Sequence, residues 1–245
     1  MKILRIAQNL YPEVAGGGAY HVHALSRDQA AAGHEITVVT VSDDRSLPAR
    51  ERRDGYEVRR CRPLASVLGN DIPPRVLSHL RRAGEFDIVH AHSHLYFSTN
   101  LAALNRRFTD TPLAITNHGL TSQSAPPKLF GAYLRTAGRW TLNAADVVFT
   151  YTETEADRLR DLGVRCPITV VANGIDTERF QPDGPESASV PDGSPQVLFV
   201  GRLVDGKRPG DVIDAIAELR ESYPAAGLAI CGTGPLEERL AATVR

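Results

Sequence analysis

Short apolar runs alternate with amphipathic stretches along most of the chain. Seven runs have the length and composition of buried strands: Lys2–Ala7, Ile36–Val41, Tyr56–Arg60, Asp87–His92, Pro112–Asn117, Asp146–Thr150 and Ile168–Val171. Five stretches between them have helical spacing: Ala19–Ala32, Pro73–Arg82, Leu95–Arg107, Lys128–Asn143 and Glu153–Leu162. This alternation predicts a doubly wound α/β domain with a parallel sheet. In the first helix, Val22, Leu25 and Ala32 are expected on one side, and Gly33 is expected to end it.

The pattern stops at residues 182–195, which are rich in Pro, Gly, Ser and Asp and have no periodicity. Such a composition predicts a linker. Beyond it the pattern resumes with a buried strand, a helix, a strand and a last helix: Gln196–Val200, Pro209–Leu219, Leu228–Cys231 and a stretch to Val244. A doubly wound domain uses about six strands. We therefore expect one domain over residues 1–181 and only the truncated start of a second over residues 196–245.

Composition excludes several classes of protein. The 245 residues contain 28 Lys and Arg against 29 Asp and Glu, so no basic surplus favours nucleic-acid binding. Cys61, Cys166 and Cys231 are far apart and form no C-x-x-C pair, which indicates reduced thiols and neither a zinc site nor a disulfide framework. The first strand leaves no room for a signal peptide, and no apolar run approaches about 18 residues. We expect a cytoplasmic protein.

One loop combines two cations with a helix start. Arg202 and Lys207 lie between the strand Gln196–Val200 and the helix that begins at Pro209. Ligands bind at such strand-to-helix loops in doubly wound folds, and free N–H groups at a helix N-terminus favour anions. The loop alone is equally compatible with a phosphate or pyrophosphate site and with a solvated basic turn.

A glycine loop, Gly16-Gly17-Gly18, separates the first strand from the first helix. Glycines allow a ligand close to the backbone N–H groups. A nicotinamide site is a weak alternative, although Asp43 or Asp44 has the place of a ribose-binding acid. Its fingerprint puts a glycine directly after the strand, whereas here eight residues intervene and His21 replaces the third glycine. A ligand-free flexible loop is a second alternative. We favour a loop that faces a phosphate or an acceptor.

Histidines gather at the ends of two predicted strands. His90, His92 and His94 alternate, so one strand face could present all three to a metal ion. No H-x-x-E or H-E-x-x-H spacing accompanies them, and Asp87 is at the opposite end of the strand. We expect one of them to face a cleft while the others pack. His118 follows the next strand, where it is placed to meet a substrate or to serve the fold.

The last strand of the first domain is followed by Asn173-Gly174, which marks a tight turn. Spacing alone favours a plain exit from the domain.

Seven short motifs, in this order and spacing, resemble the family 4-type glycosyltransferases of the GT-B fold. They are G-G-G at 16–18, G-H-E-I-T-V-V-T at 33–40, D-I-V-H-A-H-S at 87–93, T-N-H-G at 116–119, V-A-N-G-I-D-T-E-R-F at 171–180, F-V-G-R-L at 199–203 with Lys207, and G-T-G-P at 232–235. The resemblance implies two Rossmann-like domains and transfer of a sugar from a nucleotide diphosphate sugar to an acceptor, with retention of the anomeric configuration.

The resemblance also assigns residues. It implies that Arg202 and Lys207 hold the donor diphosphate with Gly17 and Gly18 beside it, and that His118 contacts the donor sugar near the reacting centre. The remaining implied cleft residues are Gly16, His92, Asn173, Gly232 and Gly234. No D-x-D motif is present to hold a metal, so the two cations are expected to replace it. No metal and no cofactor are expected.

Two motifs of the family are absent: an acidic E-G-F-G-type motif and a C-terminal helix that returns to the first domain. We therefore expect a hexosyltransferase-type enzyme that is impaired in this truncated chain. The alternative is a non-catalytic acceptor-side module whose partner chain supplies the donor domain. A metal hydrolase built on the alternating histidines is a weaker third hypothesis. The acceptor is expected to be a sugar, a lipid-linked compound or a small molecule, with peripheral membrane contact an open option. Acceptor choice is assigned to the loops Asp43–Asp54 and Leu120–Lys128.

Overall fold

The computed structural model describes residues 1–122, 125–185, 187 and 194–243. The chain divides into two compact units, Met1–Gly174 and Ile175–Arg245. Each unit has its own sheet and its own apolar core. Within the described residues, no helix is both long and apolar enough to cross a membrane.

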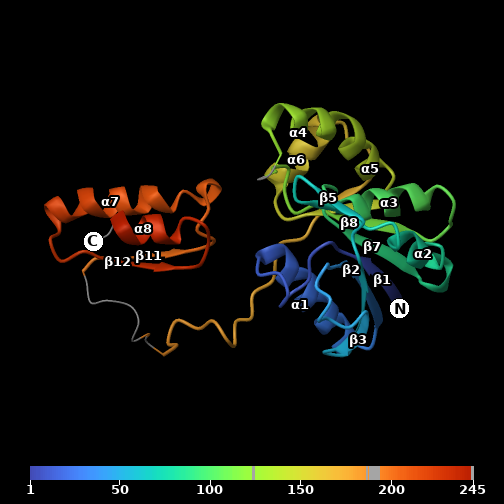
Figure 1. The fold of residues 1–245 in the computed structure, drawn as a ribbon, viewed down its shortest axis with the longest axis horizontal. Coiled ribbons are helices and arrows are strands. Elements are labelled where there is room, and N and C mark those ends of the chain that lie inside the picture. The colour runs from blue at the N-terminus through green and yellow to red at the C-terminus, as the bar shows by residue number, and fades with distance from the viewer. Residues whose placement is uncertain (123–124, 186, 188–193, 244–245) are drawn as a thin grey trace. The chain divides into compact units, whose positions relative to one another are not determined.

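The first unit is built on an eight-stranded sheet in the order β10-β9-β8-β7-β1-β2-β4-β3 (Figure 1). All neighbours are parallel except β3, which runs antiparallel to β4. The strands are β1 Lys2–Ile6, β2 Glu35–Val41, β3 Arg50–Arg53, β4 Tyr56–Cys61, β7 Ile88–His92, β8 Leu113–Thr116, β9 Val147–Thr150 and β10 Ile168–Val170. The strand order reverses at β1, so the predicted doubly wound fold is confirmed.

Helices cover both faces of this sheet. The segments are α1 Gly17–Ala31, α2 Val76–Leu80, the short 3₁₀ helix Ala83–Glu85, α3 Phe97–Arg106, α4 Pro127–Tyr133, a π-helical turn Leu134–Gly138, α5 Arg139–Asn143 and α6 Glu153–Asp161. On one face, Val22 of α1 packs on Ile3 and Val38. On the other face, residues of α2, α3, α5 and α6 share a larger core with Leu4 and Ile115.

Three elements of the first unit differ from the prediction. Strand β3 has the sequence RERR, and a charged strand carries no hydrophobic signal. The hairpin of β5 Ala65–Val67 and β6 Asn70–Ile72 is too short to show a pattern. The long helix Lys128–Asn143 is interrupted by the π-helical turn, where Gly138 packs against the side chain of His94.

Helix ends also shift. Helix α1 starts at Gly17, so Gly17 and Gly18 belong to its first turn and not to a loop. Val22 is buried as predicted, but Ala32 is exposed because the helix has already ended there. Gly33 follows with φ +88°, the left-handed conformation expected of a helix stop. Helix α2 begins only at Val76 because two prolines precede it in a turn.

The second unit contains two parallel strands with helices on one face. Its segments are β11 Gln196–Val200, the 3₁₀ helix Asp205–Lys207, α7 Pro209–Ser222, β12 Gly227–Cys231 and α8 Glu237–Thr243. Phe199 and Ile230 pack against Ile213 of α7 and Leu240 of α8. The alternate side chains Leu198 and Val200 are 58% and 72% exposed. The expectation of a buried strand is therefore wrong for one face of β11, because helices cover only the other.

The two units meet in sequence at Gly174 and Ile175. Of the predicted linker 182–195, residues 186 and 188–193 lie outside the described residues. The assignment of residues 1–181 to an acceptor-side domain and of 196–245 to the start of a donor domain stays a prediction.

Candidate functional site

A buried arginine lies between the sheet and helix α1 in the first unit. Arg5 is in the middle of β1, where its side chain points to the α1 face and is fully buried. Its guanidinium donates to Ser26 Oγ and Gln29 Oε1 of α1, both at 2.6 Å. Burial lowers the pKa of Arg5 to about 10, so it is still charged at neutral pH. The unit thus carries a fixed positive charge beneath α1.

Two histidines continue this polar row on the neighbouring strand. His90 pairs in register with Arg5, and His92 lies two residues further on the same face of β7. His90 Nε2 lies 2.8 Å from Thr116 Oγ1 of β8. Ser93 has φ +62°, and this left-handed residue ends the alternation before His94. His94 is fully buried beside the π-helical turn, so the three histidines do not share one face.

His118 is the junction of this row. It follows β8, and its two ring nitrogens lie 3.1 Å from His92 Nδ1 and 2.8 Å from the Tyr151 hydroxyl, which follows β9. The ring also contacts His21 of α1 edge-to-face, with centroids 5.4 Å apart. A Cβ on Gly18 would lie 3.5 Å from His118 Nδ1. Three strand ends and the first turn of α1 therefore converge on one imidazole.

His21 connects this cluster to the end of the sheet. It contacts the rings of His92 and Tyr151, and the side chain of Asn173, which follows β10, lies close enough to oppose the lowering of the His21 pKa by burial. Asn173 is itself exposed, and its assignment to the cleft stays a prediction.

The imidazoles of the cluster are uncharged at physiological pH. Burial, together with nearby His21, lowers the pKa of His118 to about 4. Burial and then the charges of neighbouring groups, Arg5 among them, lower the pKa values of His90 and His92 well below the ordinary value. Neutral imidazoles have one donor and one acceptor nitrogen each. His118 is therefore uncharged at neutral pH, and each of its two ring nitrogens already has a protein partner.

Among the residues that the structure describes, no group of three or more His, Cys, Asp or Glu side chains is arranged to hold a metal ion. The split between His94 and the other two histidines removes the geometry that a three-histidine metal hydrolase needs. Metal-free chemistry as such stays a prediction.

The glycine segment opens α1 beside this cluster. Gly16 precedes the helix, and a Cβ on Gly16 or Gly17 would meet no atom within 4 Å. This helix has no acidic residue in its first turn, so its N-terminal N–H groups have no local carboxylate. The segment has the open backbone surface that an anion or acceptor needs. Asp43, a candidate ribose acid, lines a separate cavity, and Asp44 accepts two hydrogen bonds from Ser46.

In the second unit, Arg202 and Lys207 lie between β11 and α7, as predicted. Both residues are exposed. Within the described residues, neither side chain makes a hydrogen bond or an ion pair, whereas the adjacent Arg208 pairs with Asp211. Arg202 and Lys207 therefore precede a 14-residue helix, and their charges are not neutralised by any described side chain.

Gly232 and Gly234 have a structural explanation. A Cβ on Gly232 would overlap the carbonyl oxygen of Gly201, and one on Gly234 would overlap that of Leu203. Backbone hydrogen bonds tie the same segments, including Leu203 N to Thr233 O at 2.9 Å. These glycines let the segment after β12 support the loop that carries Arg202.

Sequence reasoning missed three members of the cluster in the first unit. Arg5 had a signal, because a charged residue in the middle of an apolar strand needs buried partners. His21 follows Gly18 by three positions, so both lie on one side of α1. Tyr151 directly follows a strand of the sheet, at the edge where ligands bind. The structure brings these residues together with His118, Gly18, His92 and Asn173. Arg202, Lys207, Gly232 and Gly234 form their own group in the second unit.

Comparison with known proteins identifies the family. Residues 15–179 match the family described as Glycosyltransferase Family 4, and residues 181–244 match the one described as Glycosyl transferases group 1. The chain belongs to glycosyltransferase family 4.

A glycogen synthase of Mycobacterium tuberculosis is 29% identical over an alignment 269 residues long. The alignment covers 98% of this chain and 63% of the relative. The chain thus spans less than two thirds of that relative's length.

Solved structures confirm the fold. Sucrose-phosphate synthase from Thermosynechococcus elongatus matches 99% of this chain and 66% of its own, with a TM-score of 0.72 at 20% identity. Anabaena HepE in complex with UDP matches 100% of this chain and 64% of its own, with a TM-score of 0.69 at 19% identity. The architecture is that of the GT-B glycosyltransferases, as the sequence motifs predict.

Proposed function

We propose that the chain contributes to transfer of a sugar from a nucleotide diphosphate sugar to an acceptor, with the anomeric configuration retained. The observation that carries the proposal is a pair of exposed cations before α7, Arg202 and Lys207, which have no hydrogen-bond or ion-pair partner among the described residues. A diphosphate matches both charges and the free N–H groups of the helix. Family membership and the UDP bound to HepE support the same ligand.

The chemical step needs stabilisation of the leaving group. As the bond to the sugar breaks, negative charge grows on the diphosphate, and preorganised cations lower that barrier. In this proposal Arg202 and Lys207 do so without a metal or a cofactor. His118 contacts the donor sugar as an uncharged ring, since its pKa is about 4, and a sugar hydroxyl would bond to it by replacing His92 or Tyr151. Gly17 and Gly18 present backbone N–H groups close to it.

Calorimetry with UDP and with ADP, with and without EDTA, tests the binding part. We expect binding that chelation does not change. Arg202→Ala should weaken it about 10- to 100-fold, because a charged hydrogen bond contributes about 1.5–3 kcal/mol. Arg208→Ala is the matched control, since Arg208 is already paired with Asp211. Loss of binding on chelation, or equal effects of the two substitutions, would contradict the proposal.

The role of His118 needs a separate test. In a form of the protein extended to the length of its relatives, His118→Ala should reduce turnover while the melting temperature stays within a few degrees of the wild type. Parallel losses of turnover and stability would mean that His118 serves only the fold.

The finer parts of the function are proposals of the same kind. We infer a hexosyltransferase in the cytoplasm whose partners are a nucleotide sugar and a sugar, lipid-linked or small-molecule acceptor, with no nucleic acid. The matched region is 63% of the glycogen synthase, so we expect little turnover from these 245 residues alone. If a separately expressed donor half restores activity, the alternative of an acceptor-side module is favoured.

A further inference from the structure

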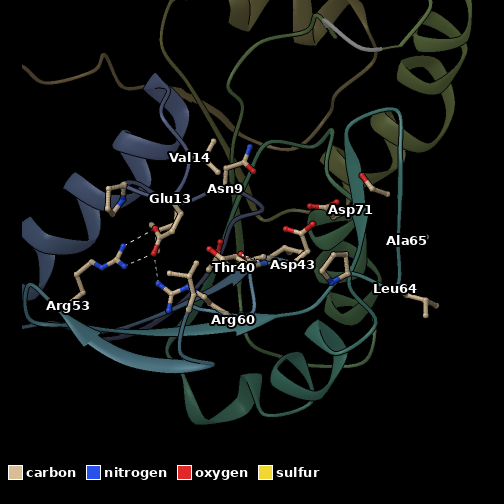
Figure 2. A pocket seen from close by; sticks show the side chains of 18 residues that line it. Asn9, Glu13, Val14, Thr40, Asp43, Arg53, Arg60, Leu64, Ala65 and Asp71 are labelled. Carbon is tan, nitrogen blue, oxygen red and sulfur yellow. Dashed lines mark hydrogen bonds and ion pairs between the residues drawn. The ribbon is translucent and has the colours of Figure 1, made fainter. Parts of the chain in front are cut away.

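A large cavity with a mixed polar and apolar lining lies at the carboxyl ends of β1, β2 and β4 in the first unit (Figure 2). Its volume is about 800 Å³, within the range of small-molecule sites. The walls come from residues 9–14 after β1, residues 40–44 at the end of β2, β-strand residues Arg53 and Arg60, and the segment that forms the β5–β6 hairpin. Ligands of doubly wound folds bind at this edge of the sheet.

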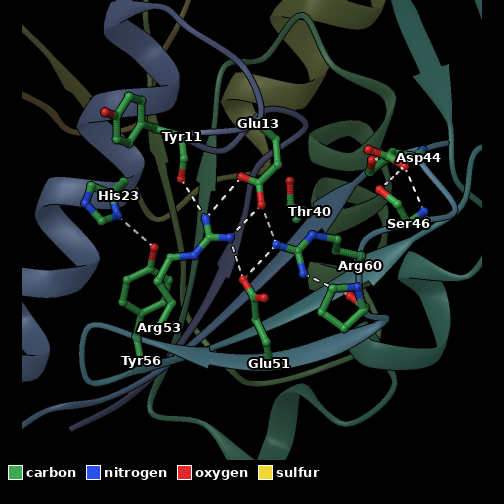
Figure 3. Close-up of polar contacts among 12 residues, drawn as sticks. Tyr11, Glu13, His23, Thr40, Asp44, Ser46, Glu51, Arg53, Tyr56 and Arg60 are labelled. Atoms are coloured by element: carbon green, nitrogen blue, oxygen red, sulfur yellow. Dashed lines mark hydrogen bonds and ion pairs between the residues drawn. The ribbon is translucent and has the colours of Figure 1, made fainter.

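One wall of the cavity belongs to a closed group of four charges, of which Glu13, Arg53 and Arg60 line the cavity and Glu51 lies behind them (Figure 3). Arg53 lies 2.6 Å from Glu13 and 2.5 Å from Glu51, and Arg60 lies 2.5 Å and 2.8 Å from the same two carboxylates. The two guanidiniums also donate to backbone carbonyls of Tyr11 and Pro48. All four side chains are at most 25% exposed.

These ion pairs remove the arginines as anion ligands. Burial by itself would raise the pKa of Glu13, but hydrogen bonds from Arg53 and Arg60 outweigh it and lower the pKa to about 2. Glu13 therefore stays charged at every working pH. A phosphate could reach either guanidinium only by displacing a carboxylate that already accepts its N–H groups.

The other charged groups of the cavity are all acidic. Asp43, Asp44 and Asp71 line it, while Arg53 and Arg60 are balanced by the two glutamates. Within the described residues, the carboxylates of Asp43 and Asp71 have no hydrogen-bond or ion-pair partner. The rest of the lining is neutral. Four residues are polar, Asn9, Thr40, Ser42 and Ser66, and eight are apolar: Leu10, Pro12, Val14, Val41, Leu47, Pro63, Leu64 and Ala65.

We propose that this cavity binds the acceptor and that the acceptor is a carbohydrate without a phosphate or carboxylate group. Sugar hydroxyls donate hydrogen bonds, and the carboxylates of Asp43 and Asp71 are free to accept them. An anionic group would meet these carboxylates and find no free cation in the wall. The proposal rests on the proposed function, because it names the acceptor class of the same transferase.

Saturation-transfer NMR on the full chain tests the charge preference without any nucleotide. One mixture contains glucose, mannose, galactose and maltotriose, and the other contains glucose 6-phosphate, mannose 6-phosphate and glucuronate. We expect signals from at least one neutral sugar and affinities at least tenfold lower for its anionic derivative. The proposal is overturned if no neutral sugar gives a saturation-transfer signal, or if an anionic sugar binds as tightly as its neutral parent.

Variants locate the binding in the cavity. The double change Asp43→Asn with Asp71→Asn should weaken binding of the neutral sugar. It should also reduce the ratio of the affinity for the neutral sugar to the affinity for its anionic derivative. Asp157→Asn on the exposed side of α6 is the matched control and should change neither. Glu13→Gln should raise the affinity for the anionic sugar, because it withdraws a carboxylate from both arginines. Thermal melting checks that each variant is folded. If the Asp43/Asp71 variant behaves like the control, the cavity is not the binding site.

Failure of this inference is distinguishable from failure of the proposed function. Nucleotide binding is measured by calorimetry through Arg202 and Lys207, and carbohydrate binding by NMR through the cavity. If the chain binds UDP or ADP and also binds an anionic sugar as tightly as its neutral parent, only the proposed class of acceptor is overturned. Neutral sugar binding without nucleotide binding would overturn the proposed transfer and leave the carbohydrate site.

Discussion

His118 and Arg202 each follow a strand at the carboxyl edge of a sheet, yet their surroundings are opposite. His118 is enclosed, and both of its ring nitrogens have protein partners. Arg202 is exposed, and within the described residues its side chain has none. The first unit thus contains a preorganised site whose polar groups hold one another. The second unit offers free charges on a small scaffold that supports them with backbone contacts alone.

The largest contrast should appear in hydrogen exchange. Amides of β11 and β12 should exchange at least about 100-fold faster than those of β1 and β7, a difference of about 2.7 kcal/mol. The reason is that β1 and β7 are covered on both faces, whereas helices cover one face of β11. Mass spectrometry after pepsin digestion resolves the segments. Equal hydrogen-exchange protection of the two sheets would contradict this difference between the units.

Gly234→Ala should destabilise the second unit alone, by about 1–3 kcal/mol, because its Cβ would overlap the backbone at Leu203. Gly206→Ala is the control, since a Cβ there meets open space. Denaturation followed by exchange of β11 and β1 amides separates the units. A variant as stable as the control would mean that the loop of Arg202 is not held by this segment.

Acid should weaken the first unit before the second. The folded pKa values of His94 and His118 are about 4, below the ordinary 6.5, so the unfolded chain binds more protons between these values. Stability is therefore complete above pH 6.5 and falls as the pH decreases toward 4, by up to about 1.4 kcal/mol per pH unit for each histidine. Urea unfolding at pH 7.5, 6 and 5 measures it. His94→Asn, if it folds, should flatten the slope; an unchanged slope would contradict the assignment.

Tyr151→Phe should have the smallest effect. It removes one hydrogen bond to His118 and should cost about 0.5–1.5 kcal/mol of unfolding free energy. The ¹⁵N shifts of His118 should also change, because the Tyr151 hydroxyl is the hydrogen-bond partner of Nδ1. The control is Tyr223→Phe in the second unit, where the side chain is 55% exposed. Unchanged shifts would mean that His92 alone orients the ring.

The fold of the first unit was largely predictable because parallel strands buried on both faces are continuous apolar runs. Strand β3 was not, because RERR carries the charges of an edge strand and no hydrophobic period. The exposed face of β11 was also missed. An apolar run does not reveal which of its faces a helix will cover.

The candidate site was predictable where a residue follows a strand within a recognisable motif, as His118 and Arg202 do. Tyr151 and His21 were missed because their importance comes from contacts between distant segments, at 33 positions' separation for the bond between Tyr151 and His118. The resemblance assigned Gly232 and Gly234 to the donor or acceptor cleft, and that assignment stays a prediction. Their physical reason, backbone contact with Gly201 and Leu203, is visible only in three dimensions.

Strand β3 has a consequence for how the protein can evolve. It is an edge strand, and its charged side chains discourage pairing with the edge of another copy. Two of those side chains, Glu51 and Arg53, also belong to the closed charge group of the cavity. A substitution of Arg53 that changes which ligand the cavity binds therefore also changes the charge of the sheet edge. The tendency of two copies to pair at this edge then changes too. Under the proposed acceptor site, selection for a new acceptor and selection against aggregation act on the same two residues, Glu51 and Arg53.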